Sequence, residues 1–462
     1  MASLLAASVF KAYDIRGTVP EQLNPEFAYL LGRALASRAK KQNIFTIITG
    51  YDGRTSSPEL SESLQQGIND EGVKSIDLGQ VPTPLVYFVA YAQNIGTAVA
   101  ITGSHNPSQY NGFKMMIGGK ALYGSDVLQL RDEMMAIESL PLANSKGARE
   151  NINIIPEYIQ RICSDVKLAR PMKIAIDCGN GVGGNVAPAL FRQLGCEVDE
   201  LFCEVDGSFP NHHPDPADPH NLEDLIKHVQ NTDCELGLAF DGDADRLGVV
   251  TKTGTIIWPD RQLILFARDV LERCPGETII YDVKCSRHVA EGITLAGGKP
   301  LMWQTGHSLI KAKLAETGAP LAGEMSGHIF FKERWYGFDD GLYTGTRLLE
   351  ILSRHDNPSD ILNAIPQDIS TPELKLEMQE GQPHALIKTL QEQASFATAQ
   401  DINTIDGVRA EYEDGFGLAR ASNTTPVVVL RFEAENPVAL ARIQDEFRQV
   451  FATYAPDAKL PF

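Results

Sequence analysis

Short apolar runs recur along the chain, and each of them ends in a turn rich in Gly, Asp or Ser. Five such runs are Ile44–Thr49, Thr97–Ile101, Lys173–Ile176, Leu236–Phe240 and Thr278–Ile280. A stretch with helix-like spacing of apolar residues is expected after each turn. Strand, turn and helix repeated in this way predict βαβ units and mainly parallel sheets. The turns then lie at the carboxyl ends of the strands, where open α/β sheets bind ligands.

The last quarter of the chain has a different pattern. Asn-Pro and Thr-Pro pairs interrupt the alternation at 357–372. Beyond them, Leu374–Leu376 and Pro426–Phe432 have the composition of strands, and Pro437–Phe451 has apolar residues at helical spacing. This order predicts a smaller α+β domain at the C-terminal end.

The chain has 462 residues, which corresponds to about three domains and allows four. Polar stretches at 141–156 and 252–260 are typical of domain edges. We therefore expect three similar α/β domains with mixed or parallel sheets, followed by an α+β domain. The expected limits are residues 1–150, 151–254, 255–365 and 366–462.

Charge narrows the range of partners. The chain carries 41 basic and 60 acidic residues, a net charge of −19, which argues against a nucleic-acid or anionic-membrane binder. A small cluster of cations could still hold a phosphorylated ligand. No uncharged apolar run reaches 18 residues, so no transmembrane helix is expected. The N-terminal stretch has no basic region, and Lys11 interrupts its apolar patch, so no signal peptide is expected.

The cysteines indicate a reducing compartment. They are seven in number, scattered, and without a C-x-x-C pair. Free thiols in the cytoplasm fit this pattern better than disulfides or structural zinc.

The turn at 102–107 (TGSHNP) is the first candidate for chemistry. Ser104 follows a Gly at the end of a buried strand and precedes His105, as a nucleophile on a tight turn would. Alternatively, Ser104 or Asn106 caps the next helix. The G-x-S-x-G elbow of hydrolases does not match, because Asn106 stands where its second Gly would be.

The turn at 241–246 (DGDADR) carries Asp241, Asp243 and Asp245 directly after an apolar strand. Three crowded carboxylates cannot all stay ionised without a cation. Oxygen ligands favour Mg²⁺ or Ca²⁺ over zinc. An EF-hand is excluded, since Arg246 and Lys252 occupy its Gly and Glu positions. The alternative is a solvated acidic turn.

Two further turns offer groups for a phosphorylated sugar. GEMSGH presents Glu324, Ser326 and His328 at alternate positions, a mixture of donors and acceptors that suits a polyhydroxylated ligand. RASNTTP, at 420–426, combines a guanidinium with hydroxyl groups, which suits a dianionic phosphate. A capped turn and a polar hairpin loop are the respective alternatives.

One motif suggests a different function, the binding of a dinucleotide. The stretch at 179–184 matches G-x-G-x-x-G, the dinucleotide-binding signature. The match is weak, because glycines are common in tight turns and this one explains none of the other loops. The pair His212–His213 lacks a third spaced ligand, so a metal site there is not favoured.

Taken together, FKAYDIRG, TGSHNP, DGDADR, GEMSGH and RASNTTP occur in an order that resembles the α-D-phosphohexomutase superfamily. GEMSGH followed by FFKERWYGFDDG looks like the bacterial phosphomannomutase/phosphoglucomutase branch. Phosphoglucosamine mutases usually carry Gln at the position of Met325. The resemblance covers essentially the whole chain.

The resemblance implies a heart-shaped molecule in which each of four domains gives one loop to a central cleft. Ser104 matches the serine that carries the phosphoryl group and contributes to the metal site. One Mg²⁺ per chain would be held by Asp241, Asp243 and Asp245. Sugar and phosphate binding would involve Glu324, Ser326, His328, Arg420, Ser422, Asn423 and Thr425. Further active-site positions are Tyr13, Arg16, His105, Lys114, Arg246, Lys284 and His307.

The implied reaction interconverts hexose 1-phosphate and hexose 6-phosphate of glucose and mannose. It passes through a 1,6-bisphosphate that reorients in the site, with glucose 1,6-bisphosphate as activator or intermediate. The resemblance also implies a cytoplasmic monomer that serves carbohydrate metabolism, including exopolysaccharide precursors. Alternatives are a phosphoglucosamine mutase, a phosphatase of the haloacid dehalogenase type using Asp241, a metal-dependent sugar-binding module, and a dehydrogenase using the Gly179 loop.

Overall fold

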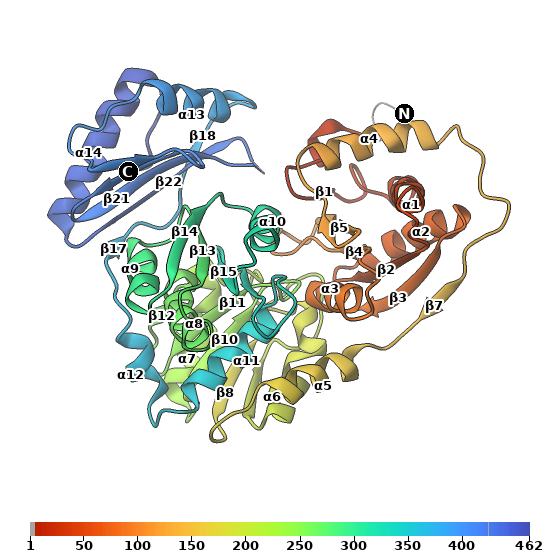
Figure 1. The fold of residues 1–462 in the computed structure, drawn as a ribbon, viewed down its shortest axis with the longest axis horizontal. Helices are drawn as coiled ribbons and strands as arrows, with labels where there is room; N and C mark the ends of the chain where they lie inside the picture. The colour runs from red at the N-terminus through yellow and green to blue at the C-terminus, as the bar shows by residue number, and fades with distance from the viewer. Residues whose placement is uncertain (1–4, 424) are drawn as a thin grey trace.

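The computed structural model describes residues 5–423 and 425–462, which form four sheets in succession along the chain. Residue 424, in the RASNTTP loop, lies outside the described part. Figure 1 shows the four units in an arc, with the first (red to orange) at the right and the fourth (blue) at the upper left. Three units combine mixed sheets with helices and the fourth is antiparallel, which confirms the expected fold class.

The first unit contains a mixed sheet in the order β1-β5-β4-β2-β3-β7, with β6 paired to β5. Helix α3 covers one face and α1, α2 and α4 cover the other. The strands are β1 (Ile15–Thr18), β2 (Thr46–Tyr51), β3 (Lys74–Gln80), β4 (Ala98–Ile101), β5 (Tyr110–Ile117), β6 (Lys120–Ala121) and β7 (Arg149–Asn151). The helices are α1 (Pro25–Lys40), α2 (Ser57–Asp70), α3 (Thr83–Ala92) and α4 (Ser125–Ile137).

The second unit has the strand order β12-β11-β10-β8-β9. Its strands are β8 (Lys173–Asp177), β9 (Glu197–Leu201), β10 (Leu236–Phe240), β11 (Leu247–Thr251) and β12 (Ile256–Ile257). Its helices are α5 (Ile155–Asp165), α6 (Ala187–Leu194) and α7 (Glu223–Asn231). The sheet runs past the expected limit at residue 254, because β12 pairs with β11.

The third unit has the order β14-β13-β15-β16. Its strands are β13 (Thr278–Asp282), β14 (Lys299–Trp303), β15 (Leu321–Gly323) and β16 (Ile329–Phe331). Its helices are α8 (Pro259–Arg273), α9 (Arg287–Leu295) and α10 (His307–Thr317). Helix α11 (Gly341–Leu352) comes next and is buried along its whole length. It contacts α6, β10 and β11 of the second unit as well as α8 and β16 of the third.

The fourth unit is an antiparallel sheet in the order β17-β22-β21-β20-β19, with β18 paired to β22. Helix α12 (Pro358–Asn363) precedes it, and α13 (Gln382–Gln393) and α14 (Pro437–Tyr454) pack on it. The strands are β17 (Ile369–Ser370), β18 (Leu374–Glu377), β19 (Asp401–Asn403), β20 (Val408–Tyr412), β21 (Gly415–Ala421) and β22 (Val427–Ala434).

The first three units share a pattern of strand pairing. It corrects the expectation that a helix follows the loops TGSHNP and DGDADR. In each of them a strand pairs in parallel with one neighbour and, after a polar loop, antiparallel with the next strand. The loops TGSHNP, DGDADR and GEMSGH therefore join β4 to β5, β10 to β11 and β15 to β16. No helix comes directly after these three loops, because the residues that follow each loop pair antiparallel with the strand before it. The loops still lie at the carboxyl ends of parallel strands.

Core packing separates the fourth unit from the other three. One continuous apolar cluster runs through the first three units and includes Leu85, Tyr158, Phe240 and Ile279. The fourth unit has a cluster of its own, centred on residues such as Phe447. The first three units are thus joined by one large apolar cluster, whereas the fourth has its own core and only a small apolar contact with the third, between Val283, Phe416 and Leu418.

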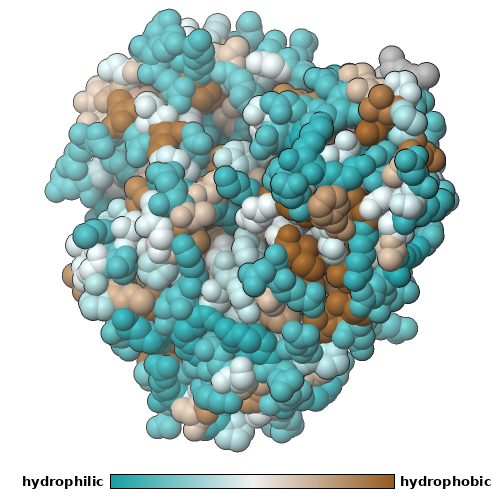
Figure 2. All heavy atoms as spheres, turned by 45° about the vertical axis from the view of Figure 1, so that its right-hand side comes forward, coloured by the Kyte–Doolittle hydropathy of each residue, from teal (hydrophilic) through white to brown (hydrophobic). Residues whose placement is uncertain are grey.

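The surface seen from the side of the first unit is mostly polar (Figure 2). Figure 2 shows smaller hydrophobic groups between the polar ones. Within residues 5–423 and 425–462, no helix is both long enough and apolar enough to cross a bilayer.

Candidate active site

The loop after β4 holds Ser104 in a strained and enclosed position. Its φ is +48°, in the left-handed region that costs a non-glycine residue about 1 kcal/mol or more. The hydroxyl donates to Asp241 Oδ2 at 3.0 Å and lies 3.3 Å from His105 Nδ1. The Ser104 residue is 1% exposed, so its hydroxyl lies beneath the surface that His105 presents to solvent.

A buried arginine that the sequence analysis did not identify holds this loop. The Arg54 guanidinium donates to the carbonyl oxygens of Ser104 (2.8 Å), Asn106 (2.5 Å), Pro107 (2.6 Å) and Tyr110 (2.8 Å). A Cβ at Gly103 would lie 2.4 Å from Arg54 Cζ, so only glycine permits this approach. Arg54 therefore fixes the backbone that carries Ser104.

The loop after β10 brings three carboxylates together. One oxygen from each of Asp241, Asp243 and Asp245 lies within 4.8 Å of the others, and all three side chains are buried. Lys114 of β5 places its Nζ 2.7 Å from Asp243 Oδ2 and 2.5 Å from Asp245 Oδ2. The backbones of the two loops touch, since a Cβ at Gly242 would lie 2.3 Å from Ser104 O. Ser104, the acidic loop and Lys114 thus form one cluster across the first two units.

The three carboxylates of this cluster carry more negative charge than Lys114 alone can compensate. Burial, together with Asp245 and Asp243, raises the pKa of Asp241 well above its usual value. Burial opposes the charge on Lys114, but Asp243 and Asp245 outweigh it and hold the Lys114 pKa well above normal. Within the described residues, Asp243 Oδ1 and Asp245 Oδ1 are buried without a hydrogen-bond partner. Such oxygens fit a hard divalent cation such as Mg²⁺.

The loop after β15 faces the acidic cluster. Glu324 Oε1 accepts from Gly306 N at 2.5 Å, and burial raises the Glu324 pKa. His328 Nδ1 lies 3.2 Å from Asp339 Oδ2, while its Nε2 accepts from Arg246 Nε at 3.1 Å. Arg246 thereby connects the acidic loop with the third loop.

Two histidines of the cleft are held neutral. Burial, followed by Arg246 and other cations, lowers the pKa of His105 well below its usual value. Burial and the charge of Lys311 do the same for the pKa of His307. His105 and His307 are therefore unprotonated at neutral pH and are weak bases, whereas Lys114 keeps its proton.

The fourth loop lies between β21 and β22. Arg420 Nε pairs with Asp406 Oδ2 at 3.0 Å. The backbone N–H and the hydroxyl of Thr425 both donate to Ser422 Oγ, at 3.2 and 3.1 Å. Asn423 Nδ2 donates to the Tyr13 hydroxyl, so this loop reaches the first unit across the mouth of the cleft.

Two further cations are held by acidic partners. Lys284 Nζ lies 2.5 Å from Glu373 Oε1 in the fourth unit. Arg16 pairs with Asp14 at 2.6 Å and donates to Asn106 Oδ1 at 2.6 Å.

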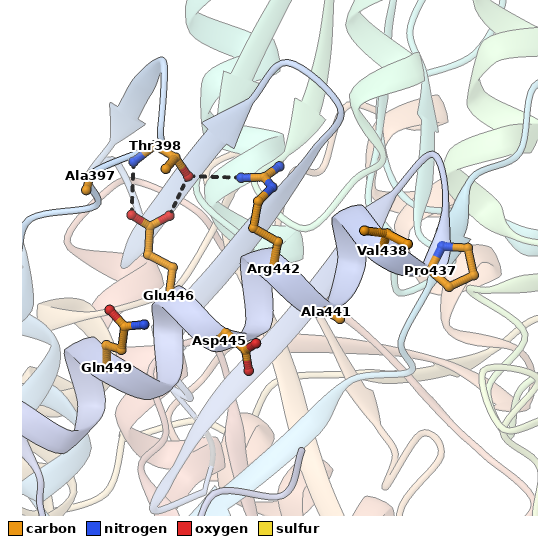
Figure 3. Close-up of a pocket in the computed structure, with 9 residues that line it drawn as sticks. All are labelled: Ala397, Thr398, Pro437, Val438, Ala441, Arg442, Asp445, Glu446 and Gln449. Atoms are coloured by element: carbon orange, nitrogen blue, oxygen red, sulfur yellow. Dashed lines mark hydrogen bonds between the residues drawn. The ribbon is translucent and has the colours of Figure 1, made fainter.

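These groups surround a cleft of about 690 Å³. Of the predicted site residues, its lining includes Tyr13, Arg16, His105, Arg246, Lys284, His307, Glu324, Ser326, His328, Arg420, Ser422, Asn423 and Thr425. Ser104, Lys114 and the three aspartates do not line it but lie beneath. Figure 3 shows a separate groove on the outer side of the fourth unit, along α14, which shares no lining residue with the cleft.

Several polar residues of the site carried no local sequence signal. Thr83 donates to Asp243 Oδ2 at 2.6 Å, and Lys311 pairs with Asp339 at 2.9 Å. Thr83 begins α3, Lys311 lies within α10, and Arg54 lies in the turn between β2 and α2. The sequence YDGRTS at 51–56, a polar turn after a strand, is the one signal that could have pointed to Arg54.

The G-x-G-x-x-G stretch at 179–184 (the glycine-rich loop) and the pair His212–His213 have structural roles. His212 Nε2 lies 3.0 Å from Asp177 Oδ2. In the glycine-rich loop, Val182 N donates to Gly242 O at 3.1 Å, so this loop supports the acidic loop.

Four family models match the chain in order. They describe the phosphoglucomutase/phosphomannomutase α/β/α domains I, II and III at residues 7–139, 156–254 and 258–369, and the C-terminal domain at 373–450.

Relatives match over the full length. A phosphoglucomutase of Neisseria meningitidis is 55% identical, with 96% of this chain and 97% of the relative covered. A phosphomannomutase/phosphoglucomutase of Pseudomonas aeruginosa is 51% identical, with 100% and 99% covered. A crystal structure of a phosphoglucomutase/phosphomannomutase family protein from Burkholderia thailandensis is 52% identical, with a TM-score of 0.93, and covers 98% of this chain and 99% of its own. These matches confirm the predicted relationship: the chain belongs to the phosphoglucomutase/phosphomannomutase family of the α-D-phosphohexomutase superfamily.

Proposed function

We propose that this protein is an isomerase that interconverts the 1-phosphates and 6-phosphates of glucose and mannose. The observation that carries the proposal is the Ser104 hydroxyl, 3.0 Å from Asp241, beneath a cleft that Arg420 of the fourth unit also lines. A phosphoryl donor at one end and a phosphate-binding loop at the other suit a substrate with a phosphate at either end. The names of the relatives support glucose and mannose as the sugars.

In this proposal Ser104 carries a phosphoryl group that passes to the free hydroxyl of a hexose 1-phosphate. The resulting 1,6-bisphosphate turns around, and its other phosphate returns to Ser104. In-line phosphoryl transfer needs mainly positioning and charge compensation. Arg54 positions the Ser104 backbone, while Lys114 and Arg246 supply positive charge.

The residues that would hold Mg²⁺ are Asp241, Asp243 and Asp245, together with an oxygen on Ser104. When bound, Mg²⁺ would neutralise phosphoryl charge. The two buried aspartate oxygens without partners support this assignment.

The sugar hydroxyl must lose a proton as it accepts the phosphoryl group. His105 is neutral and its Nδ1 lies 3.3 Å from Ser104 Oγ. This favours His105 over Lys114 as the acceptor, with His307 as the second candidate.

The finer expectations are part of the same proposal. These are one Mg²⁺ per chain, glucose 1,6-bisphosphate as activator or intermediate, a monomeric state, a cytoplasmic location and a role in supplying exopolysaccharide precursors. The domain limits at 150 and 365 are proposed as well, whereas the limit expected at 254 is moved to after residue 257, because β12 pairs with β11 of the second unit.

The test combines phosphopeptide mapping with a comparison of substrates. We expect a stable phosphate on Ser104, and turnover of glucose and mannose 1-phosphates with higher kcat/KM than glucosamine 1-phosphate. A preference for glucosamine 1-phosphate would indicate a phosphoglucosamine mutase. An acid-labile phosphate on Asp241 would indicate a phosphatase of the haloacid dehalogenase type.

A further inference from the structure

Two of the seven cysteines are in direct contact. Cys178 follows β8 and Cys203 follows β9, and these strands pair in parallel with Asp177 opposite Leu201. The two Sγ atoms lie 3.5 Å apart although 25 positions separate the residues in the sequence. A disulfide needs about 2.05 Å between the sulfurs, so they must approach by about 1.5 Å.

The two thiols differ in accessibility. Cys178 is fully buried, whereas Cys203 is partly exposed. The hydrogen bond from Cys203 and the burial raise the pKa of Cys178 well above its usual value, so Cys178 is the less reactive thiol towards an oxidant from solvent. A partly exposed thiol in contact with a buried one matches the pairing of an oxidised cysteine with a resolving cysteine.

The pair is connected to both catalytic loops through intervening residues. After Cys203, the segment 204–209 binds the glycine-rich loop, with Asn180 donating to Glu204 O at 2.8 Å and Asp206 N donating to Asn180 O at 3.0 Å. The Arg54 guanidinium, which holds the Ser104 loop, lies 5.2 Å above the ring of Phe209. A covalent bond at Cys203 would therefore tie down a segment that supports the active site.

We propose that Cys178 and Cys203 are a site of reversible disulfide formation, which fastens segment 204–209 to the loop after β8. The oxidant is a peroxide. The Cys203 sulfur attacks one peroxide oxygen, the O–O bond breaks, and a sulfenic acid and water form. The Cys178 sulfur then attacks the Cys203 sulfur and the S–O bond breaks. The Cys178 thiol proton passes to the departing hydroxyl, which leaves as a second water. Two thiols and one hydrogen peroxide thus give one disulfide and two waters, and a dithiol reductant reverses the change.

The experiment treats the native full-length chain with hydrogen peroxide, unfolds it, and counts thiols that alkylate. We expect the count to fall from seven to five, with a mass loss of two hydrogens, and one cross-linked peptide containing Cys178 and Cys203. Dithiothreitol should restore all seven. Cys203→Ser should abolish the cross-link, whereas Cys163→Ser, at a partly exposed cysteine outside the pair, should leave it intact.

Other outcomes overturn the proposal. These are a cross-link that involves other cysteines, addition of oxygen to Cys203 without a disulfide, or retention of all seven thiols under peroxide that oxidises a free thiol peptide. Hydrogen exchange then tests the fastening itself. Amides of 204–209 should exchange several-fold more slowly in the oxidised chain than in the reduced chain, but not in peroxide-treated Cys203→Ser. Equal exchange rates in the oxidised and reduced chains would contradict the proposed fastening of this segment.

Discussion

The first three units and the fourth unit are joined to the site in different ways. The first three share one apolar cluster, and their loops meet in a buried group in which Ser104, Lys114 and three aspartates are at most 3% exposed. The fourth has a core of its own. It contacts the third through a small apolar cluster of Val283, Phe416 and Leu418 and through polar groups, including Arg409 with the carbonyl oxygens of Val283 and Cys285 at 2.6 Å.

The difference matches two chemical tasks. Phosphoryl transfer needs groups held to a fraction of an ångström, which shared apolar packing provides. Binding the distant phosphate needs charge that faces an open cleft, which Arg420 provides on a separately packed unit. Substitutions in the first three units and in the fourth test this division. Those in the first three should impair phosphoryl transfer, and those in the fourth should impair binding of the distant phosphate.

The largest effect is expected from Ser104→Ala. Removal of the phosphoryl acceptor should lower kcat by about 10⁴-fold or more, while sugar-phosphate binding remains measurable by calorimetry. Ser108→Ala, at an exposed serine of the same loop, should keep normal turnover. Substantial turnover of Ser104→Ala would exclude the phosphoserine role.

Metal removal should have the next largest effect. Treatment with EDTA should abolish nearly all turnover, because three buried carboxylates then face the phosphoryl group with only partial compensation. Added Mg²⁺ should restore the activity and raise the melting temperature. Full activity in chelator would refute a metal site at these aspartates.

Arg54→Lys tests the support of the Ser104 loop. Lysine keeps the charge but loses the planar fork that binds four carbonyl oxygens. We expect kcat to fall by about 100-fold with a smaller change in KM. Arg149→Lys, at a partly exposed arginine of the same unit, is the control, and equal kinetics of the two variants would contradict the positioning role.

Arg420→Ala tests the fourth unit. Loss of one charge-assisted contact to phosphate corresponds to about 1.5–3 kcal/mol, so KM should rise by about tenfold to hundredfold. The unfolding temperature should change little. The matched control is Arg442→Ala in the outer groove of Figure 3, which should leave KM unchanged. An unchanged KM for Arg420→Ala would argue against the phosphate loop.

The smallest effect concerns the polar contact between the third and fourth units. Burial opposes the charge on Glu373, but Lys284 outweighs it and lowers the Glu373 pKa to about 2, from 4.5. A lowered carboxyl pKa stabilises the folded state above pH 4.5, and this contribution is lost as pH falls toward 2. Glu373→Gln should therefore lower the melting temperature at pH 6 by only about 2 °C, since solvent screens the pair.

The difference between wild type and Glu373→Gln should shrink as the pH falls below 4.5. Glu380→Gln, at an exposed glutamate of the same unit, should show no such trend. A difference that stays constant down to about pH 3 would contradict the proposed ion pair.

Sequence periodicity predicted the strands that carry the site, but not the elements that come after them. The run at Leu236–Phe240 is β10 as expected, and the apolar run before TGSHNP is β4. The next elements are antiparallel strands rather than helices, because an apolar run such as Tyr110–Ile117 is compatible with either structure until its pairing partner is known. The spacing of Asp241, Asp243 and Asp245 was enough to suggest a metal site, whereas Arg54 gave no comparable signal.

The sequence by itself determined the fold class, the order of the four loops and the residue types each offers, since periodicity and side-chain chemistry are local properties. Only the tertiary structure decided that the Ser104 hydroxyl reaches Asp241, that Lys114 enters the acidic cluster, and that Cys203 touches Cys178. These contacts join residues from different strands or different units. Their distances depend on how sheets pack, which no local pattern encodes.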